Sequence, residues 1–138
     1  MEFSDVIKNR YSCKKFSSEQ IGKDKLDAIL EAGRVAPTAK NLQEQHIYVV
    51  QSESALETID KLTPCRYNAP TVLIVAYNKN NVFTYLGDKR NSGIEDATIV
   101  ATHLMLAAYN EGVDSCWINF FNPCLLYTSD AADDRISV

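Results

Sequence analysis

The sequence lacks the patterns that mark metal-binding, exported or membrane-spanning chains. It has only four cysteines, and no two of them form the C-x-x-C pair that is typical of zinc sites. The first residues include acidic side chains and no apolar run after a basic region, which excludes a signal peptide. We therefore expect no bound metal, and a cytoplasmic protein whose thiols are reduced.

Long hydrophobic runs and an excess of positive charge are also missing. The longest apolar run lies within residues 99–109 and is too short to cross a bilayer. The net charge is −4 and the isoelectric point is about 5.1, whereas nucleic-acid binders usually carry a basic face. These features predict neither a membrane nor a nucleic-acid partner.

Three common enzyme motifs are absent as well. The sequence has no G-x-G-x-x-G, no P-loop and no G-x-S-x-G, so a classical dinucleotide fold or a serine hydrolase has no support. What is present is a chain of 138 residues with 46% hydrophobic residues, the size and composition of one globular domain.

Apolar spacing predicts four helices and three strands. A stripe of apolar residues at helical spacing, which begins at Leu26 and includes Gly33, predicts a helix that ends before Pro37. Ser54 and Glu57 form a predicted capping box for another helix. The other predicted elements are helices near Phe3–Ile7 and at Ile94–Glu111, and strands at 46–51, 71–77 and 115–121. The order of these elements indicates an α+β fold, a mixed α/β sandwich.

A basic cluster lies in the segment "NRYSCKKF", residues 9–16. Arg10, Ser12 and Lys14 alternate, so in an extended segment they face the same side. Two cations and a hydroxyl on one side are suited to a phosphate or a carboxylate. From spacing alone, a solvated basic turn is the favoured alternative.

A second polar cluster lies in "APTAKNLQEQ", residues 36–45, between a predicted helix and a predicted strand. The amides of Asn41 and Gln43 offer donors and acceptors that suit the edge of a heterocycle. The alternative is a turn in which the asparagine caps its own backbone. Three tyrosines are candidate acid groups, although nothing distinguishes them from the other four: Tyr11, Tyr67 and Tyr85.

Four motifs in order resemble the nitroreductase family of flavoproteins over residues 1–123: "RYSCKKF", "APTAKNLQ", "APTVLIVAY" and "GIEDATIVATHLMLAAYNEGVDSCWINFFNP". The resemblance implies a central antiparallel-type sheet flanked by helices, incomplete here at its C-terminus. It also implies FMN bound at a homodimer interface. Hydride would pass from NADH or NADPH through the flavin to a nitroaromatic, a quinone or a similar small acceptor. The alternative is a non-catalytic flavin-binding or structural fragment.

The resemblance assigns the FMN contacts by matching positions. The phosphate and ribityl chain would contact the basic segment, residues 9–16, with Lys14 also within reach of the pyrimidine edge. The flavin ring would contact the amide loop, residues 36–45. The implied contacts are Arg10, Tyr11, Ser12, Lys14, Asn41 and Gln43. No catalytic side chain is required, because the flavin carries the chemistry. Glu44 stands where the family commonly has proline, and it would add negative charge near the flavin.

Residues 124–138 differ from the rest of the chain. The stretch "SDAADDRISV" is small, polar and acidic, and it is similar to peptides translated from sequencing-adapter DNA. We interpret residues 1–123 as the flavin-binding domain and 124–138 as a foreign or disordered tail. A frayed native C-terminus is the alternative.

Overall fold

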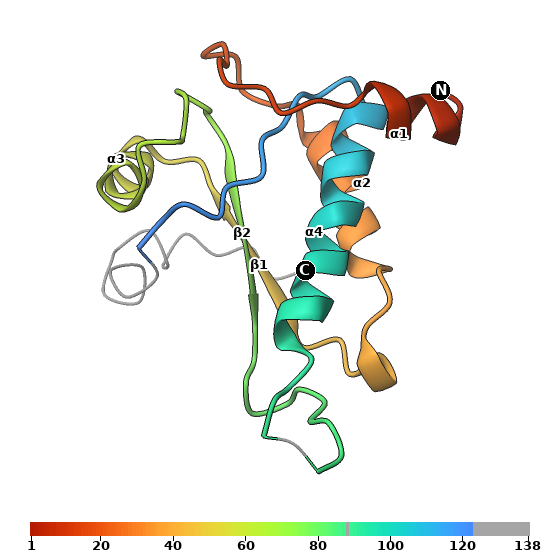
Figure 1. The fold of residues 1–138 in the computed structure, drawn as a ribbon. Helices are drawn as coiled ribbons and strands as arrows, with labels where there is room; N and C mark the ends of the chain where they lie inside the picture. Colours follow the sequence, from red (N-terminus) through yellow and green to blue (C-terminus); the bar gives the residue numbers. More distant parts are fainter. Residues whose placement is uncertain (88, 123–138) are drawn as a thin grey trace.

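Two antiparallel strands separate a pair of long helices from a single shorter one (Figure 1). The computed structural model describes residues 1–87 and 89–122. Its elements are α1 (Phe3–Asn9), α2 (Lys23–Arg34), the short 3₁₀ helix η1 (Ala39–Asn41), β1 (Gln45–Val50), α3 (Glu53–Leu62), β2 (Val72–Tyr77) and α4 (Gly93–Asn110). The predicted α+β fold is confirmed.

The sheet is antiparallel, with Gln45 opposite Tyr77 and Val50 opposite Val72. Side chains alternate between its two faces. Ile47 and Val49 join the main core with α2 and α4, and Val50 joins a smaller core with α3. The β1 strand therefore divides its burial between two cores.

The main core forms where α2 and α4 pack against each other. The predicted stripe of α2 is confirmed, since all four of its members are buried: Leu26, Ile29, Leu30 and Gly33. Gly33 permits the close approach of α4, because a Cβ at this position would lie 2.7 Å from Cδ2 of Leu104. Within the described ranges, no helix combines the length and apolar character that a bilayer span needs.

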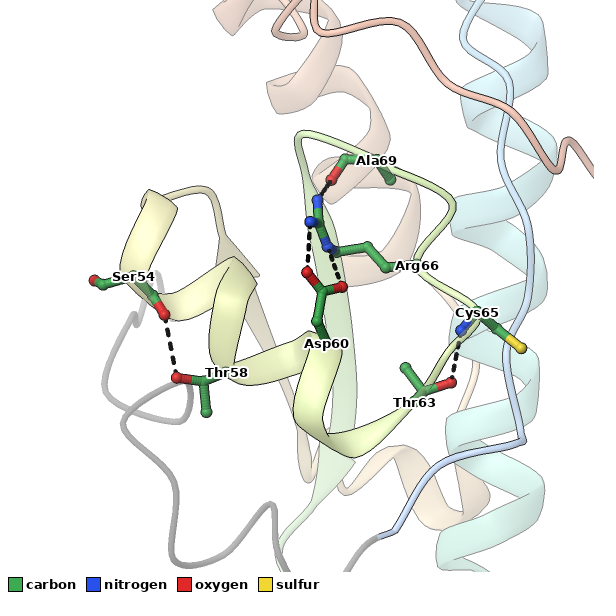
Figure 2. Close-up of polar contacts among 7 residues, drawn as sticks. All are labelled: Ser54, Thr58, Asp60, Thr63, Cys65, Arg66 and Ala69. Carbon is green, nitrogen blue, oxygen red and sulfur yellow. Dashed lines mark hydrogen bonds and ion pairs between the residues drawn. The ribbon is translucent and has the colours of Figure 1, made fainter.

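The α3 helix begins earlier than predicted. Ser52 caps it, since its side chain accepts a hydrogen bond from the Ala55 amide at 3.3 Å. The predicted capping box of Ser54 and Glu57 is wrong, because Ser54 is already helical and its carbonyl accepts a bond from the Thr58 hydroxyl (Figure 2). The buried residues of α3 are Ala55, Ile59 and Leu62, and the partly buried Leu56 packs against them.

The predicted third strand, 115–121, is not a strand. Only Ser115 pairs, in a single parallel bridge with Ser12. The chain then crosses toward α3, where the Asn122 amide donates to the carbonyl of Leu62 at 3.1 Å. One end of this segment is bonded beside α1 and the other beside α3, so the segment does not run alongside β2 as a paired strand. The β2 strand is half-buried along its length. The predicted tail, 124–138, lies outside the described residues.

Candidate functional site

The basic segment leaves α1 in an extended conformation and is fixed to the far end of α4. The backbone at Arg10 is extended, with φ −60° and ψ 145°. The Cys13 amide donates to the carbonyl of Ser115 at 2.9 Å, and the Tyr11 hydroxyl donates to Asp114 at 3.0 Å. The segment is therefore held beside the residues that follow α4.

A cavity of about 320 Å³ opens beside this segment. Ser12 and Lys14 line it together with Tyr67 and residues 116–120. Arg10 does not line the cavity, but its Nε is buried and has no hydrogen-bond partner among the described residues. A buried guanidinium nitrogen without an acceptor is costly, and a bound anion would supply that acceptor. The residues present thus fit a phosphate group.

Arg66 positions the loop that carries Tyr67 to this cavity. Its guanidinium donates two hydrogen bonds to Asp60, both at 2.7 Å, and a third to the carbonyl of Ala69 at 2.8 Å (Figure 2). Tyr67 itself has a left-handed backbone, with φ 53°, a conformation that non-glycine residues rarely adopt. The Arg66 bonds close the loop on either side of this residue and hold it in that conformation.

Replacing Arg66 with methionine should lower the free energy of unfolding by about 1–2 kcal/mol, since Asp60 is half-exposed and water screens part of the interaction. Arg66 lowers the pKa of Asp60, so this stabilisation is present above the ordinary aspartate pKa and is lost as the pH falls through the lowered one. Urea unfolding at neutral and at acid pH measures both effects. The matched control is Lys23→Met, which removes an exposed ion pair and should change little. If both variants lose the same free energy of unfolding, Arg66 does not hold the Tyr67 loop in the way described.

The amide loop has a constrained backbone. Lys40, Asn41 and Gln43 all have positive φ, between 53° and 55°. The Gln43 side chain donates to Oδ1 of Asn41 at 2.7 Å, and the Gln43 amide donates to the Thr38 hydroxyl at 3.0 Å. Such conformations cost of order 1–3 kcal/mol each and persist only where surrounding contacts impose them. The Asn41 backbone amide donates to the carbonyl of Thr38 at 2.9 Å.

Asp96 on α4 supplies one of these contacts, and the sequence analysis did not identify it. Its Oδ1 accepts from the Ala39 amide at 3.0 Å, and its Oδ2 accepts from the Ser92 hydroxyl at 2.7 Å. The available signal was an acidic residue in the first turn of an otherwise apolar helix. Glu44, which was expected to place its charge near the flavin, is only 3% exposed and interacts with Asp96.

The two predicted halves of the site lie at opposite ends of α4 (Figure 1). The amide loop is bonded to Asp96 in the first turn of this helix, and the basic segment is bonded to Ser115 beyond its last turn. A helix of 18 residues is about 27 Å long, so the basic segment and the amide loop lie about one such helix length apart within one copy of the described chain.

The three candidate tyrosines all hold their protons more firmly than an ordinary tyrosine does. The hydrogen bond to Asp114 raises the pKa of Tyr11, and a hydrogen bond with Cys65, followed by burial, raises that of Tyr67. Burial, followed by the charge of Glu95, raises the pKa of Tyr85. At neutral pH these groups can donate a proton but are poor bases. Among the described residues, no cluster of three or more His, Cys, Asp or Glu side chains could hold a metal.

The family model of the nitroreductases matches two overlapping parts of the sequence, residues 7–66 and 64–133. The chain belongs to the nitroreductase family. A nitroreductase family protein of Clostridium difficile 630 has a similar structure, with a TM-score of 0.89, 30% identity and coverage of 100% of this chain and 80% of that one. A nitroreductase of Bacteroides fragilis, solved with bound FMN, has a TM-score of 0.76 at 25% identity, covering 92% of this chain and 77% of its own.

Two curated relatives from this family carry names that mention a nicotinamide cofactor. YodC of Bacillus subtilis, named as a proposed NAD(P)H nitroreductase, is 28% identical over 86% of this chain and 76% of its own length. A protein of Methanothermobacter thermautotrophicus, named as a proposed NADH dehydrogenase/NAD(P)H nitroreductase, is 25% identical over 88% of this chain. The chain described here spans 62% of the length of that relative.

Proposed function

We propose that this chain is an FMN-dependent oxidoreductase that takes hydride from NADH or NADPH and reduces a nitroaromatic, a quinone or a similar small molecule. The observation that carries the proposal is the cavity lined by Ser12 and Lys14, because both belong to the basic segment in which the buried Nε of Arg10 has no partner among the described residues. In a chain with a net charge of −4, this local positive charge favours a small anion such as the FMN phosphate. Three free thiols, Cys13, Cys65 and Cys116, agree with a cytoplasmic location.

Each part of the site has a separate binding role in this proposal. Arg10 neutralises the phosphate, Ser12 donates a hydrogen bond to it, and Tyr11 fixes the segment through Asp114. Lys14 is exposed and long enough to reach from the cavity toward the ring. Asn41 and Gln43 present their remaining amide atoms to the heterocycle. When bound, the flavin accepts and donates hydride, and the protein supplies binding and orientation.

We further propose that the flavin lies between two copies of the chain. The basic segment and the amide loop are separated by the length of α4, so each flavin would contact the basic segment of one copy and the amide loop of the other. A two-fold arrangement satisfies this for both copies at once, because each copy gives one half to each site.

Mixing two defective variants tests this arrangement. Arg10→Ala and Asn41→Leu should each bind FMN weakly alone, since each removes one half of every site. A mixed dimer contains one site with both side chains intact, so refolding the two variants together should restore part of the binding. Flavin fluorescence titration of the mixture against each variant measures the recovery. If both residues serve one site within a single copy, mixing restores nothing and the shared site is rejected.

A non-catalytic flavin-binding or structural chain is the second candidate, because this chain spans only part of some relatives. Absorbance bands of bound flavin in the purified protein would support FMN binding. Oxidation of NADH or NADPH by the same material, with a quinone as acceptor, would support the enzyme. Bound flavin without turnover would support the second candidate. If the chain binds no flavin at saturating FMN, both the FMN-dependent oxidoreductase and the non-catalytic flavin-binding chain are rejected.

A further inference from the structure

A compact group of buried polar side chains joins the amide loop to the first turn of α4. Glu44, Ser92 and Asp96 are 3%, 2% and 2% exposed. Ser92 precedes α4, Asp96 lies in its first turn, and Glu44 ends the loop just before β1. Polar groups this deeply buried normally have at least one hydrogen-bond partner, so the donors and acceptors around each oxygen bear on whether it carries a proton.

The two carboxyl groups differ in their partners. Both oxygens of Asp96 accept a hydrogen bond, from the Ala39 amide and from the Ser92 hydroxyl. In Glu44, Oε1 accepts from the Gln45 side chain at 2.9 Å, whereas Oε2 is buried with no donor directed at it from the described residues. Asp96 and Glu44 interact, and each shifts the pKa of the other. A proton on Oε2 of Glu44 would give both groups a complete set of partners.

Charge leads to the same assignment. Within the part of the chain that the structure describes, neither Glu44 nor Asp96 forms an ion pair; the three ion pairs there involve other carboxylates, those of Asp27, Glu31 and Asp60. Two adjacent buried carboxylates without a cation would repel each other strongly. Burial and then the proximity of Asp96 raise the pKa of Glu44. Burial opposes ionisation of Asp96 too, but hydrogen bonds from Ser92, Glu44 and Ala39 outweigh it and lower the pKa of Asp96.

Tyr85, Glu95 and two cations lie in the same region as this pair. Tyr85 is close enough to Asp96 for their charges to interact, and Glu95 also faces Tyr85. The Arg90 guanidinium lies 4.8 Å from the ring centre of Tyr85, and the Lys40 ammonium lies 5.8 Å from that of Phe83. Both cations are thus placed over aromatic faces.

We propose that Glu44 and Asp96 are positioning residues for the amide loop, which they hold by sharing one proton. The proton stays on Glu44, which donates a hydrogen bond to the carboxylate of Asp96. That carboxylate also accepts a hydrogen bond from the Ala39 amide. This contact fixes the turn in which Asn41 and Gln43 have their left-handed backbones. The effect on the loop follows from the structure alone, and the effect on cofactor affinity rests on the proposed function.

The shared proton confines the ordered loop to a window of pH. As the pH rises through the raised pKa of Glu44, a second buried charge appears beside Asp96, and the stability contributed by the proton is lost. As the pH falls through the lowered pKa of Asp96, the acceptor of the Ala39 amide is protonated and its contribution is lost. The loop is therefore held best between these two values.

The first experiment needs no flavin. Carbon-13 NMR of the side-chain carboxyl groups in the full chain, recorded from pH 3 to pH 9, follows each proton directly. Glu44 should titrate above the ordinary glutamate value of about 4.3, and Asp96 below that of aspartate. The Ala39 amide resonance should shift with the same alkaline midpoint as Glu44. A normal Glu44 titration, or an Ala39 resonance that does not follow it, would overturn the proposal.

The second experiment uses Glu44→Gln, which keeps the size of the side chain and supplies a permanent N–H donor toward Asp96. FMN affinity of the unmodified chain should weaken as the pH rises through the Glu44 midpoint, while Glu44→Gln should lose this dependence and keep its neutral-pH affinity. Asp96→Asn should weaken FMN binding about tenfold, as expected for a lost charge-assisted bond. The exposed Glu57→Gln on α3 is the control and should follow the unmodified chain.

The two experiments separate the two proposals. If no variant binds FMN but the NMR titration behaves as described, the proposed function fails and the carboxyl pair stands. If FMN binds with the same pH dependence in Glu44→Gln as in the unmodified chain, the positioning role is rejected and the proposed function stands.

Discussion

Replacing Arg10 with alanine should weaken FMN binding by about tenfold or more, the largest loss expected from any single site residue. Hydrogen bonds between charged groups contribute roughly 1.5–3 kcal/mol each. The Nε of Arg10 is already desolvated without a partner, so little further cost is incurred when a phosphate arrives. Flavin fluorescence titration at low and at high salt measures the loss.

The control for this variant is Lys8→Ala, which removes the same charge from an exposed position on α1. If Arg10 acted only through the overall field of the protein, the two variants would lose similar affinity, and added salt would abolish both losses. A direct contact predicts that the Arg10 loss persists at high salt and that Lys8→Ala binds normally. Unchanged affinity in Arg10→Ala would remove the basic segment from the site.

Leu104→Ala should be the most destabilising single change in the core, by about 2–5 kcal/mol in the free energy of unfolding. Leu104 is 5% exposed and packs where α2, α4 and β1 meet. One wall of its site is Gly33, which has no side chain to move into the space, and the Ile47 side chain forms another. The cavity left by the truncation should therefore remain largely unfilled.

Thermal and urea unfolding measure this effect, because each 1 kcal/mol corresponds to roughly 2–8 °C in Tm for domains of this size range. Leu86→Ala is the matched control: Leu86 is fully exposed, and the same truncation should leave stability nearly unchanged. A Leu104→Ala variant as stable as the control would show that α2 and α4 repack freely around Gly33.

Elements with a strong local pattern were predictable from the sequence. The stripe of α2 and the strands that became β1 and β2 were placed to within a residue or two, because apolar spacing determines which side chains can be buried together. The ring Nδ1 of His103 on α4 lies 3.1 Å from the carbonyl oxygen of Ala32, a contact that links α4 to α2. The predicted strand at 115–121 failed because its apolar residues are placed by distant anchors at Ser12 and Leu62, which no local pattern reveals.

The candidate site was only partly predictable, for a related reason. The residue types suited to a phosphate and to a heterocycle were visible in two short segments of the sequence. Their placement at opposite ends of α4 depends on tertiary contacts through Asp96 and Ser115, so it could not be deduced from spacing. The carboxyl of Glu44 was expected to disturb the flavin because sequence does not reveal which way a side chain points from a loop.

The bonds that hold the basic segment also determine when it can form during synthesis. Tyr11 bonds to Asp114, a partner 103 positions later in the chain, and Cys13 bonds to Ser115. At about 5–20 residues per second, roughly 5–20 s separate the synthesis of these partners. Throughout that interval the nascent chain carries Arg10, Ser12 and Lys14 on a tether without its anchor. The proposed phosphate site therefore cannot be complete until α4 has left the ribosome.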